Sequence, residues 1–264
     1  MPGRPIWFEL MTPDPDAVRD FYRAVVGWEI PPSGSPVGTG HMDYRMIQRS
    51  DGGMAGGVLK MSQDMIDHGG KPGWMTYFEV DDVPAAIAQI EQAGGKTFMP
   101  PQTMEVGTIA MVGDPQGAPF YVMNPTPPAD RPNAKSDVWD AMADERCRWI
   151  ELATTDAPAA REFYRDLLGW EFRDVMPMGP AGDYLFIRHG DEQLGAISPI
   201  MREGMPPFWL CYFGVHEASA AHVAALANGG TQVGDPHEVP GGLFVFTAVD
   251  PAGALVAFVG PKGA

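Results

Sequence analysis

The sequence contains a long internal repeat, and this repeat limits the folds that the chain can adopt. The first half reads ELMTPD from Glu9, FYR from Phe21 and GWE from Gly27. The second half reads ELATTD from Glu151, FYR from Phe163 and GWE from Gly169, each 142 positions later. A later motif also recurs, as DPQGA from Asp114 and as DPAGA from Asp250. Solenoid repeats are only about 20–50 residues long, so a repeat of this length predicts a duplicated domain.

Length and charge narrow the class of protein. A chain of 264 residues with 45% hydrophobic residues is long enough for two domains that each bury a core. The formal net charge is −16, so the chain repels phosphate backbones and anionic lipid. We therefore expect no nucleic-acid partner and no membrane partner.

Cysteine use and hydropathy predict the compartment. The two cysteines, Cys147 and Cys211, are too few for a disulfide framework and are typical of reduced thiols. The amino terminus has no apolar stretch like that of a signal peptide, and no apolar run approaches the roughly 20 residues that span a bilayer. We expect a soluble, cytoplasmic protein.

A proline-rich segment separates the two copies of the repeat. The residues from Pro125 to Pro132 read PTPPADRP, and proline fixes φ and removes a backbone donor. We therefore expect a first domain at residues 1–124, a linker at 125–145 and a second domain at 146–264. Within this linker, residues 138–145 are expected to add one helical turn.

Each half contains the same smaller pattern twice. In the first, a strand at 6–11 precedes a helix that Asp14 or Thr12 caps and Gly27 ends. Further elements are expected at 44–48, 57–61, 74–80, 84–93, 109–112 and 119–123. The second half repeats them at 148–153, 158–168, 184–188, 195–200, 209–215, 218–227, 243–249 and 255–259. The chain is therefore expected to be α+β, with two βαβββ units in each half.

These motifs resemble a known family. The FY-x-x-x-x-GW helix end, the Gly94-Gly95 pair and the D-P-x-G-x hairpin are similar to the vicinal oxygen chelate superfamily, which includes glyoxalase I, bleomycin-resistance proteins and extradiol dioxygenases. The likeness covers nearly the whole chain outside the linker and is greatest to tandem, glyoxalase-like proteins. It implies that each pair of units forms a curved mixed sheet around a cup-shaped cavity. Because this fold hosts many chemistries, it does not by itself assign a function.

The resemblance also implies positions for a divalent metal, and this sequence departs from the family there. Family enzymes place His, Gln or Glu ligands on the first and last strands of the units. Counting from the turn motifs puts other residues at these positions, namely Trp7, Met75 and Tyr121 in the first half and Trp149, Leu210 and Ala257 in the second. None offers imidazole or carboxylate, the usual ligands of such ions. A divalent metal is compatible with the family, but we expect no cofactor here.

Two acidic residues are candidates for the polar group of a site. Glu9 and Glu151 each lie two residues after the tryptophan of the same strand, so alternation places tryptophan and glutamate on one face. In one interpretation each is a general base or an anchor for a ligand hydroxyl or amine. In the other each is structural, capping a buried backbone group or pairing with an arginine such as Arg45 or Arg188.

The same alternation defines the expected ligand-binding set. Tyr77 and Tyr212 follow Met75 and Leu210 by two positions and share their face, although an ordinary core role explains these tyrosines too. The complete set of expected ligand-binding residues is Trp7, Met75, Tyr77, Tyr121, Trp149, Leu210 and Tyr212. The six histidines are not paired between the halves and are expected to be scattered on the surface.

Three functions remain open at this stage. The first is a metal-free protein that binds or sequesters an aromatic or carbonyl-containing small molecule. The second is a glyoxalase-like lyase or isomerase that uses Glu9 or Glu151 as acid or base. The third is a partner-binding protein with a vestigial site. The first-domain set has more polarizable side chains and slightly favours ligand binding there, and the chain is expected to be a monomer with an internal pseudo-dimer or a homodimer.

Overall fold

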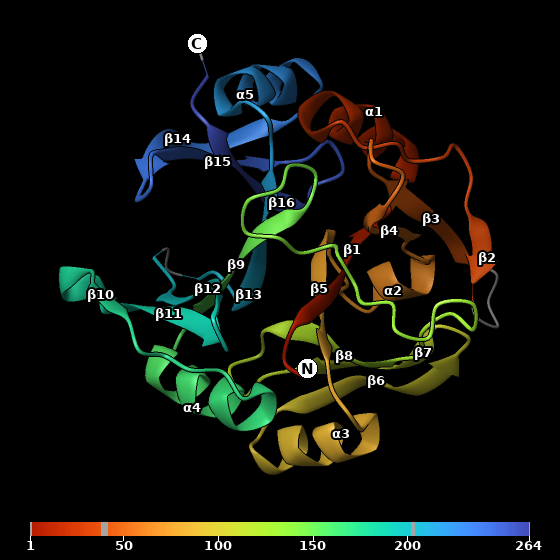
Figure 1. The fold of residues 1–264 in the computed structure, drawn as a ribbon, viewed down its shortest axis with the longest axis vertical. Coiled ribbons are helices and arrows are strands. Elements are labelled where there is room, and N and C mark those ends of the chain that lie inside the picture. Colours follow the sequence, from red (N-terminus) through yellow and green to blue (C-terminus); the bar gives the residue numbers. More distant parts are fainter. Residues whose placement is uncertain (1, 38–41, 202–203, 264) are drawn as a thin grey trace. The chain divides into compact units, whose positions relative to one another are not determined.

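The computed structural model describes residues 2–37, 42–201 and 204–263. Four modules follow one another along the chain, and each has the order strand, helix and three strands (Figure 1). In the first half they are β1 (Pro5–Thr12), α1 (Pro15–Val26), β2 (Ser35–Val37), β3 (Met42–Gln48) and β4 (Met54–Lys60), then β5 (Gly73–Glu79), α3 (Val83–Gln92), β6 (Lys96–Met104), β7 (Gly107–Gly113) and β8 (Pro119–Pro125). A short helix, α2 (Gln63–Asp67), separates these two modules.

The second half repeats this order. Its modules are β9 (Cys147–Thr154), α4 (Ala157–Leu168), β10 (Val175–Pro177), β11 (Asp183–His189) and β12 (Glu192–Pro199), then β13 (Phe208–Gly214), α5 (Ala218–Ala227), β14 (Thr231–Val239), β15 (Leu243–Val249) and β16 (Leu255–Pro261). A 3-10 turn, η1 (Gly179–Ala181), precedes β11. The predicted α+β class and the βαβββ repeat are therefore confirmed.

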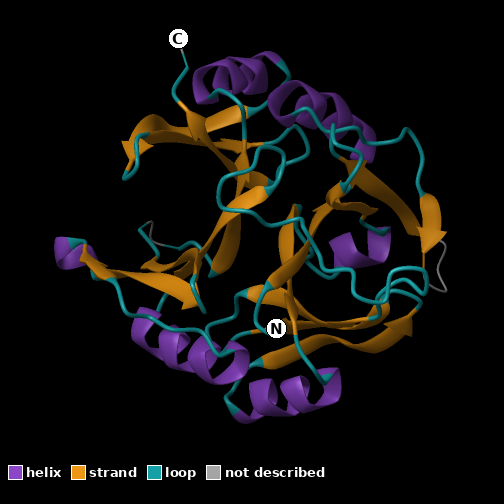
Figure 2. Ribbon diagram, in the orientation of Figure 1, coloured by secondary structure: helices purple, strands orange, loops and turns teal. Residues whose placement is uncertain are grey.

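Every module contributes four strands to a curled, mixed sheet. Its first strand runs parallel to its last, as β1 does to β4 and β9 to β12, and its other neighbours are antiparallel. A parallel pair requires a crossover connection, and the module's helix provides it. Helix α3 packs on β6, β7 and β8, and α5 packs on β14, β15 and β16 (Figure 2).

The helix after β1 begins and ends at the residues that the sequence indicates. The Asp14 carboxylate accepts the backbone N–H groups of Asp16 and Ala17, both at 3.1 Å. Gly27 ends the helix with φ +93°, a left-handed conformation that favours glycine. Asp14, and not Thr12, is therefore the N-cap.

The two compact units of the structure do not coincide with the two halves of the sequence repeat. One compact unit, unit 1, contains residues 1–6, 75–136 and 149–210, and the other, unit 2, contains residues 7–74, 137–148 and 211–264. Unit 1 thus combines the last module of the first half with the first module of the second half. Unit 2 combines the two remaining modules. The sequence domains 1–124 and 146–264 stay a prediction drawn from the repeat.

The FYR and D-P-x-G motifs meet inside each unit. In unit 2 the Tyr22 hydroxyl donates to Asp250 Oδ2 at 3.0 Å and accepts the Trp74 indole N–H at 2.9 Å. In unit 1 the Tyr164 hydroxyl donates to Asp114 Oδ2 at 3.1 Å. Burial raises the pKa of all four groups, both tyrosine hydroxyls and both carboxyls. Both motifs are therefore structural, and each bond joins the two halves of the sequence.

A second repeated contact ties the segment before each first strand to a buried tryptophan. The Trp170 indole donates to the Gly3 carbonyl at 2.7 Å, and the Trp28 indole donates to the Glu145 carbonyl at 2.9 Å. Both tryptophans have no exposed surface. Gly3 and Glu145 are 142 positions apart and both have positive φ, +94° and +61°. The repeat therefore begins before the strands themselves.

Ion pairs hold the end of the linker in unit 2, where the sequence analysis placed a helical turn. That expectation is wrong: the described residues 138–145 contain no helix, and Trp139 forms an isolated bridge with Cys147. Arg49 pairs with Asp51 at 3.1 Å and with Asp137 at 2.5 Å, and Arg146 pairs with the same two carboxylates. These side-chain contacts replace helical hydrogen bonds as the restraint on this segment.

Two further expectations from the sequence concern membrane-spanning helices and the cysteines. In the part of the chain that the structure describes, no helix is long and apolar enough to cross a membrane. Cys147 and Cys211 are both buried and are not joined to each other.

Candidate functional site

Strand β9 places Trp149 and Glu151 on one face. Its alternate residues Ile150 and Leu152 have no exposed surface, whereas Trp149 and Glu151 are only partly buried. Successive side chains of a strand point to opposite faces, so the two partly exposed residues share the face away from the core. The structure therefore keeps this pair accessible.

Two hydroxyls hold the Glu151 carboxylate. Tyr184 on β11 donates to Oε2 at 2.8 Å, and Ser198 on β12 donates to Oε1 at 2.9 Å. The Trp149 indole N–H in turn donates to the Tyr184 hydroxyl at 3.2 Å. Burial, and then the Glu151 charge, raise the pKa of Tyr184, so its hydroxyl remains a donor at neutral pH.

The first half has a related but more enclosed arrangement. The Trp7 indole donates to the Tyr44 hydroxyl at 2.7 Å, as Trp149 does to Tyr184. Glu9, however, is only 3% exposed. In the first half, Leu59 pairs with Met11. In the second half, Ser198 pairs with Ala153, the residue that corresponds to Met11, so Leu59 stands where the second half has Ser198. The first half therefore has no serine hydroxyl at the position of Ser198.

The tyrosines expected at the site in the first half pack against each other. Tyr77 and Tyr121 are register partners on β5 and β8, and their rings stack at 4.1 Å with an angle of 6° between the planes. Tyr77, Tyr121 and Met75 are each at most 6% exposed. This agrees with the core interpretation of Tyr77.

In the second half the corresponding residues differ. Tyr212 is partly exposed, and its register partner is Ala257, which has no ring, where Tyr77 has Tyr121. Leu210 is buried. That the complete expected set converges on one cavity in each domain stays a prediction.

Sequence reasoning missed three residues of this arrangement. These residues are Tyr44 on β3, Tyr184 on β11 and Ser198 on β12, and none lies on the strand of the glutamate in its half. The register between strands cannot be derived from the sequence of one strand alone. The repeat offered a signal for two of them, because Tyr44 and Tyr184 are 140 positions apart, close to the spacing of the other motifs. Ser198 has no such counterpart.

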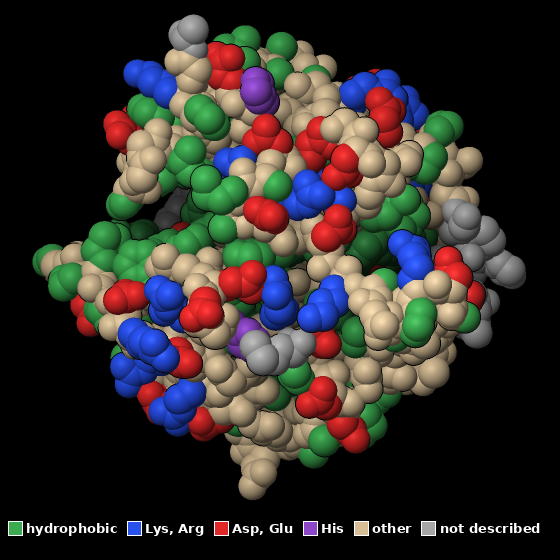
Figure 3. All heavy atoms as spheres, in the orientation of Figure 1, with side chains coloured by type: hydrophobic (Ala, Val, Ile, Leu, Met, Phe, Trp, Pro, Cys, Tyr) green, Lys and Arg blue, Asp and Glu red, His purple; other side chains and the backbone are tan. Residues whose placement is uncertain are grey.

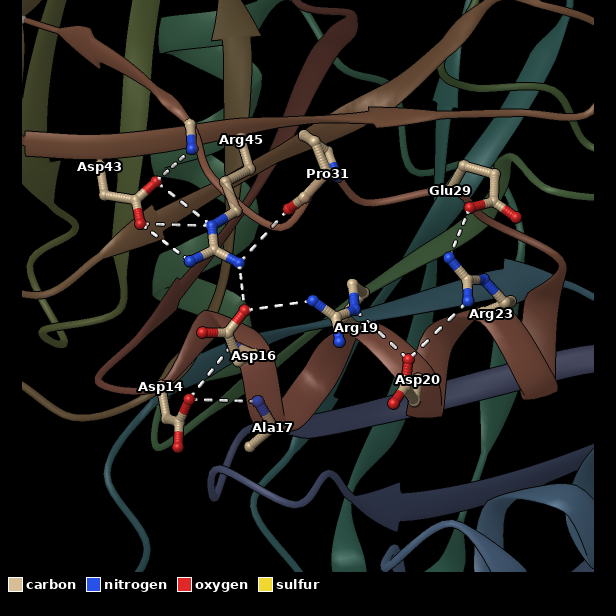
Figure 4. A network of polar contacts seen from close by, with 11 residues as sticks. Asp14, Asp16, Ala17, Arg19, Asp20, Arg23, Glu29, Pro31, Asp43 and Arg45 are labelled. Carbon is tan, nitrogen blue, oxygen red and sulfur yellow. Dashed lines mark hydrogen bonds and ion pairs between the residues drawn. The ribbon is translucent and has the colours of Figure 1, made fainter.

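The arginines suggested as structural partners of the glutamates have other carboxylates beside them. Arg45 pairs with Asp16 at 2.8 Å and with Asp43 at 2.9 Å, and it also donates to the Pro31 carbonyl (Figure 4). The hydrogen bond from Arg45 lowers the pKa of Asp43. Arg188 lies 3.6 Å from Asp174. Arg45 thus fixes the start of α1 against β3.

The residues at the family's metal positions do not fit a metal ion. Trp7, Met75, Tyr121, Trp149, Leu210 and Ala257 supply no imidazole or carboxylate. Among residues 2–37, 42–201 and 204–263, no three His, Cys, Asp or Glu side chains form a group that could hold an ion.

The histidines are not all on the surface as expected. His68, His216 and His237 are exposed, and His41 lies outside the described residues. His189 is 7% exposed, so the surface expectation is wrong for it. It occupies a buried position on β11, where an ideal Cβ on Gly3 would lie 3.0 Å from its Nε2.

Comparison with family models identifies the fold. Residues 7–123 match the model of the glyoxalase-like domain, and residues 146–258 match that of the Glyoxalase/Bleomycin resistance protein/Dioxygenase superfamily. The chain belongs to this superfamily, that of the vicinal oxygen chelate proteins, and carries two of its domains in tandem. The resemblance read from the motifs is confirmed.

Two curated relatives match along nearly their whole length. A Mycobacterium tuberculosis protein named "Putative glyoxylase CFP32" is 28% identical over 263 residues, with 98% of this chain and 95% of the relative covered. The "Anthracycline biosynthesis protein DnrV" of Streptomyces peucetius is 29% identical over 268 residues, with 96% and 91% covered.

Solved structures share the fold at lower identity. The Mn(II)-bound glyoxalase from Novosphingobium aromaticivorans has a TM-score of 0.64 and 18% identity, with 98% of this chain and 82% of that chain covered. Homoprotocatechuate 2,3-dioxygenase from Arthrobacter globiformis has a TM-score of 0.64 and 15% identity, with 98% and 80% covered. At these identities the likeness concerns the fold alone.

Proposed function

We propose that the chain is a small-molecule binding protein of this superfamily whose second domain receives the ligand on the face of Trp149 and Glu151, without a metal ion. The observation that carries the proposal is Glu151, a partly exposed residue whose carboxylate is held by the Tyr184 and Ser198 hydroxyls. A fixed, accessible acceptor beside aromatic rings is typical of small-molecule sites, where a few polar groups orient an otherwise apolar ligand.

The choice of the second domain rests on exposure. The sequence alone slightly favours the first domain, but four residues of its expected site, Glu9, Met75, Tyr77 and Tyr121, are at most 6% exposed. In the second domain Trp149 and Glu151 are partly exposed. A ligand reaches exposed side chains without displacing packed ones, so the second domain is the better candidate.

The names of the relatives suggest a ligand class. One relative is named for anthracycline biosynthesis and another as a glyoxylase. Polycyclic hydroxyquinones and 2-oxoaldehyde adducts are therefore the first compounds to test. A phenolic hydroxyl is a suitable donor to Glu151, and a flat ring system is a suitable partner for Trp149.

Catalysis is the second candidate, and the Tyr184–Glu151 hydrogen bond favours it. A carboxylate fixed by two donors is a competent general base, and the tyrosine is a proton donor 2.8 Å away. A glyoxalase-like isomerase or lyase would abstract a proton next to a carbonyl with Glu151. Assays on 2-oxoaldehyde–thiol adducts separate this activity from binding alone.

A matched pair of variants tests the proposal. Tryptophan fluorescence and thermal shifts are measured with a panel of hydroxyanthraquinones, because a ligand of the native state raises the midpoint of unfolding by mass action. A hydrogen bond to a charged group contributes about 1.5–3 kcal/mol, so Glu151→Gln should weaken binding about tenfold or more. Glu9→Gln is the matched control and should bind as wild type.

The possible outcomes assign the site. If Glu9→Gln weakens binding and Glu151→Gln does not, the first domain holds the ligand and the choice of domain is wrong. If binding is unchanged in both variants, the carboxylates are structural. If no compound of the panel binds, the partner-binding alternative with a vestigial site is preferred.

A further inference from the structure

Three aromatic side chains, Trp149, Tyr184 and Phe186, form a cluster next to Glu151. Phe186 on β11 lies 6.1 Å from Trp149 and 5.2 Å from Tyr184, measured between ring centroids, with planes at 77° and 75°. All three side chains are partly exposed. Figure 3 shows hydrophobic side chains gathered over β10 and β11, and β11 carries Tyr184 and Phe186.

Strand register places the carboxylate next to the rings. Phe186 pairs with Ala196, and Ala196 pairs with Glu151, so the three lie in one row across the sheet. Ala196 between them has a single methyl group, and Phe186 and Glu151 are therefore separated by the smallest side chain after glycine. The result is a face with a carboxylate on one side and aromatic rings on the other.

A carboxylate beside several rings has a specific chemical preference. A cation over an aromatic face is attracted by the ring quadrupole, and several rings around one ammonium group form the known aromatic cage. The Glu151 carboxylate adds a direct charge interaction, and the net charge of −16 concentrates cations near the whole molecule. The arginine two positions after Phe186, Arg188, lies beside Asp174, whose carboxylate offsets its charge.

The first half does not present this combination. Met46 takes the position of Phe186, since Met46 pairs with Gly57 and Gly57 pairs with Glu9. Its carboxylate is buried, whereas Glu151 is not. The cluster of rings beside an accessible glutamate is therefore a property of the second half, and Met46 supplies a matched control position.

We propose that the Trp149–Tyr184–Phe186 face with Glu151 recognises an organic ammonium group on the ligand. This inference rests on the proposed function, because it names the ligand class of the same site. An ammonium group would lie against the exposed ring faces with Glu151 as its counter-ion, and the rest of the ligand would extend along the apolar surface of β11.

The test compares two molecules of nearly the same shape and different charge. Choline and 3,3-dimethyl-1-butanol differ chiefly in whether the central atom is a quaternary nitrogen or a carbon. Each is titrated into the full-length protein, and binding is followed by tryptophan fluorescence and by ligand-observed nuclear magnetic resonance. Choline should bind about tenfold or more tightly than the alcohol, because both the cage and the carboxylate act on charge. Added salt should weaken choline binding and leave the alcohol unchanged.

Two substitutions separate the rings from the carboxylate. Phe186→Leu keeps apolar bulk but removes a ring, so it should reduce choline binding several-fold and leave binding of the alcohol unchanged. Glu151→Gln should have a similar effect on choline. Met46→Leu, at the corresponding position of the first half, should bind both probes as wild type does. Circular dichroism and the thermal midpoint of each variant confirm that it is folded.

Each result decides between the two proposals. Equal affinity for choline and the alcohol overturns the ammonium inference. The ammonium inference is also overturned if the protein binds hydroxyanthraquinones through Glu151 but does not bind choline. In both cases the proposed small-molecule binding function remains supported. Failure of both panels to bind overturns the function itself.

Discussion

Tyr22→Phe tests whether the repeated FYR motif stabilises the protein. The hydroxyl of Tyr22 is fully buried and makes two hydrogen bonds, as a donor to Asp250 Oδ2 and as an acceptor from the Trp74 indole. The substitution removes one oxygen atom and keeps the ring. The Asp250 carboxylate and the Trp74 indole therefore stay in place but lose the hydroxyl to which both are bound.

The expected loss follows from these two bonds. A hydrogen bond to a carboxylate contributes about 1.5–3 kcal/mol, and a buried donor left without an acceptor costs about 1–3 kcal/mol. Asp250 keeps the backbone N–H groups of Ala252 and Ala254, and a phenyl ring is easier to bury than a phenol. We therefore expect a loss near the lower end of the sum, about 3 kcal/mol, or roughly 6–12 °C in the midpoint.

Urea unfolding measured by fluorescence and by circular dichroism gives this free energy if the two transitions coincide. Tyr184→Phe is the comparison, because Tyr184 is partly exposed whereas Tyr22 is fully buried, so a smaller loss is expected there. A double-mutant cycle with Asp250→Asn isolates the Tyr22–Asp250 coupling. A loss of less than about 0.5 kcal/mol for Tyr22→Phe would refute the reasoning.

Two further predictions concern Asp51, in the turn between β3 and β4, and Gly3, in the segment before β1. The Gly53 backbone N–H and the guanidinium of Arg49 lower the pKa of Asp51 to about 2. The contribution of Asp51 to stability is therefore present above its ordinary pKa of 3.8 and is lost as the pH falls toward 2. Acid unfolding of the Asp51→Asn variant should lack this part of the transition. A Cβ on Gly3 would lie 2.1 Å from the Leu168 carbonyl at φ +94°, whereas one on Gly52 would meet nothing within 4 Å at φ +83°. Gly3→Ala should therefore lower the thermal midpoint clearly more than Gly52→Ala, and equal effects would contradict the steric argument.

Much of the fold could be predicted because the repeat and the helix signals are local. The caps Asp14 and Gly27 and the helix from Ala218 to Ala227 follow from a few neighbouring residues. Strands β6 and β14 were missed, because they contain Pro100, Pro101 and Gly234, which argue against a strand. Both are the last strand in the order of their sheet, and their pairing has register shifts that accommodate these residues.

The candidate site was predicted less well, because it depends on contacts between strands. Alternation was enough to place Trp149 and Glu151 on one face. It could not identify Tyr184 and Ser198 as the residues that hold the carboxylate, since these come from β11 and β12 and reach it only in one register. The burial of Glu9, Met75, Tyr77 and Tyr121 could not be predicted from the sequence either. This burial is the reason why we propose the second domain, and not the first, as the ligand-binding domain.

One small residue accounts for part of the difference between the two halves. Opposite Glu9 the chain has Gly57, and an ideal Cβ there would lie 2.2 Å from the Tyr44 hydroxyl. Tyr44 therefore occupies the space next to the sheet that the missing side chain leaves. Opposite Glu151 the chain has Ala196, whose methyl group fills that space. With Ala196 at that position, the Tyr184 hydroxyl donates to the Glu151 carboxylate at 2.8 Å, on the face that we propose for ligand binding.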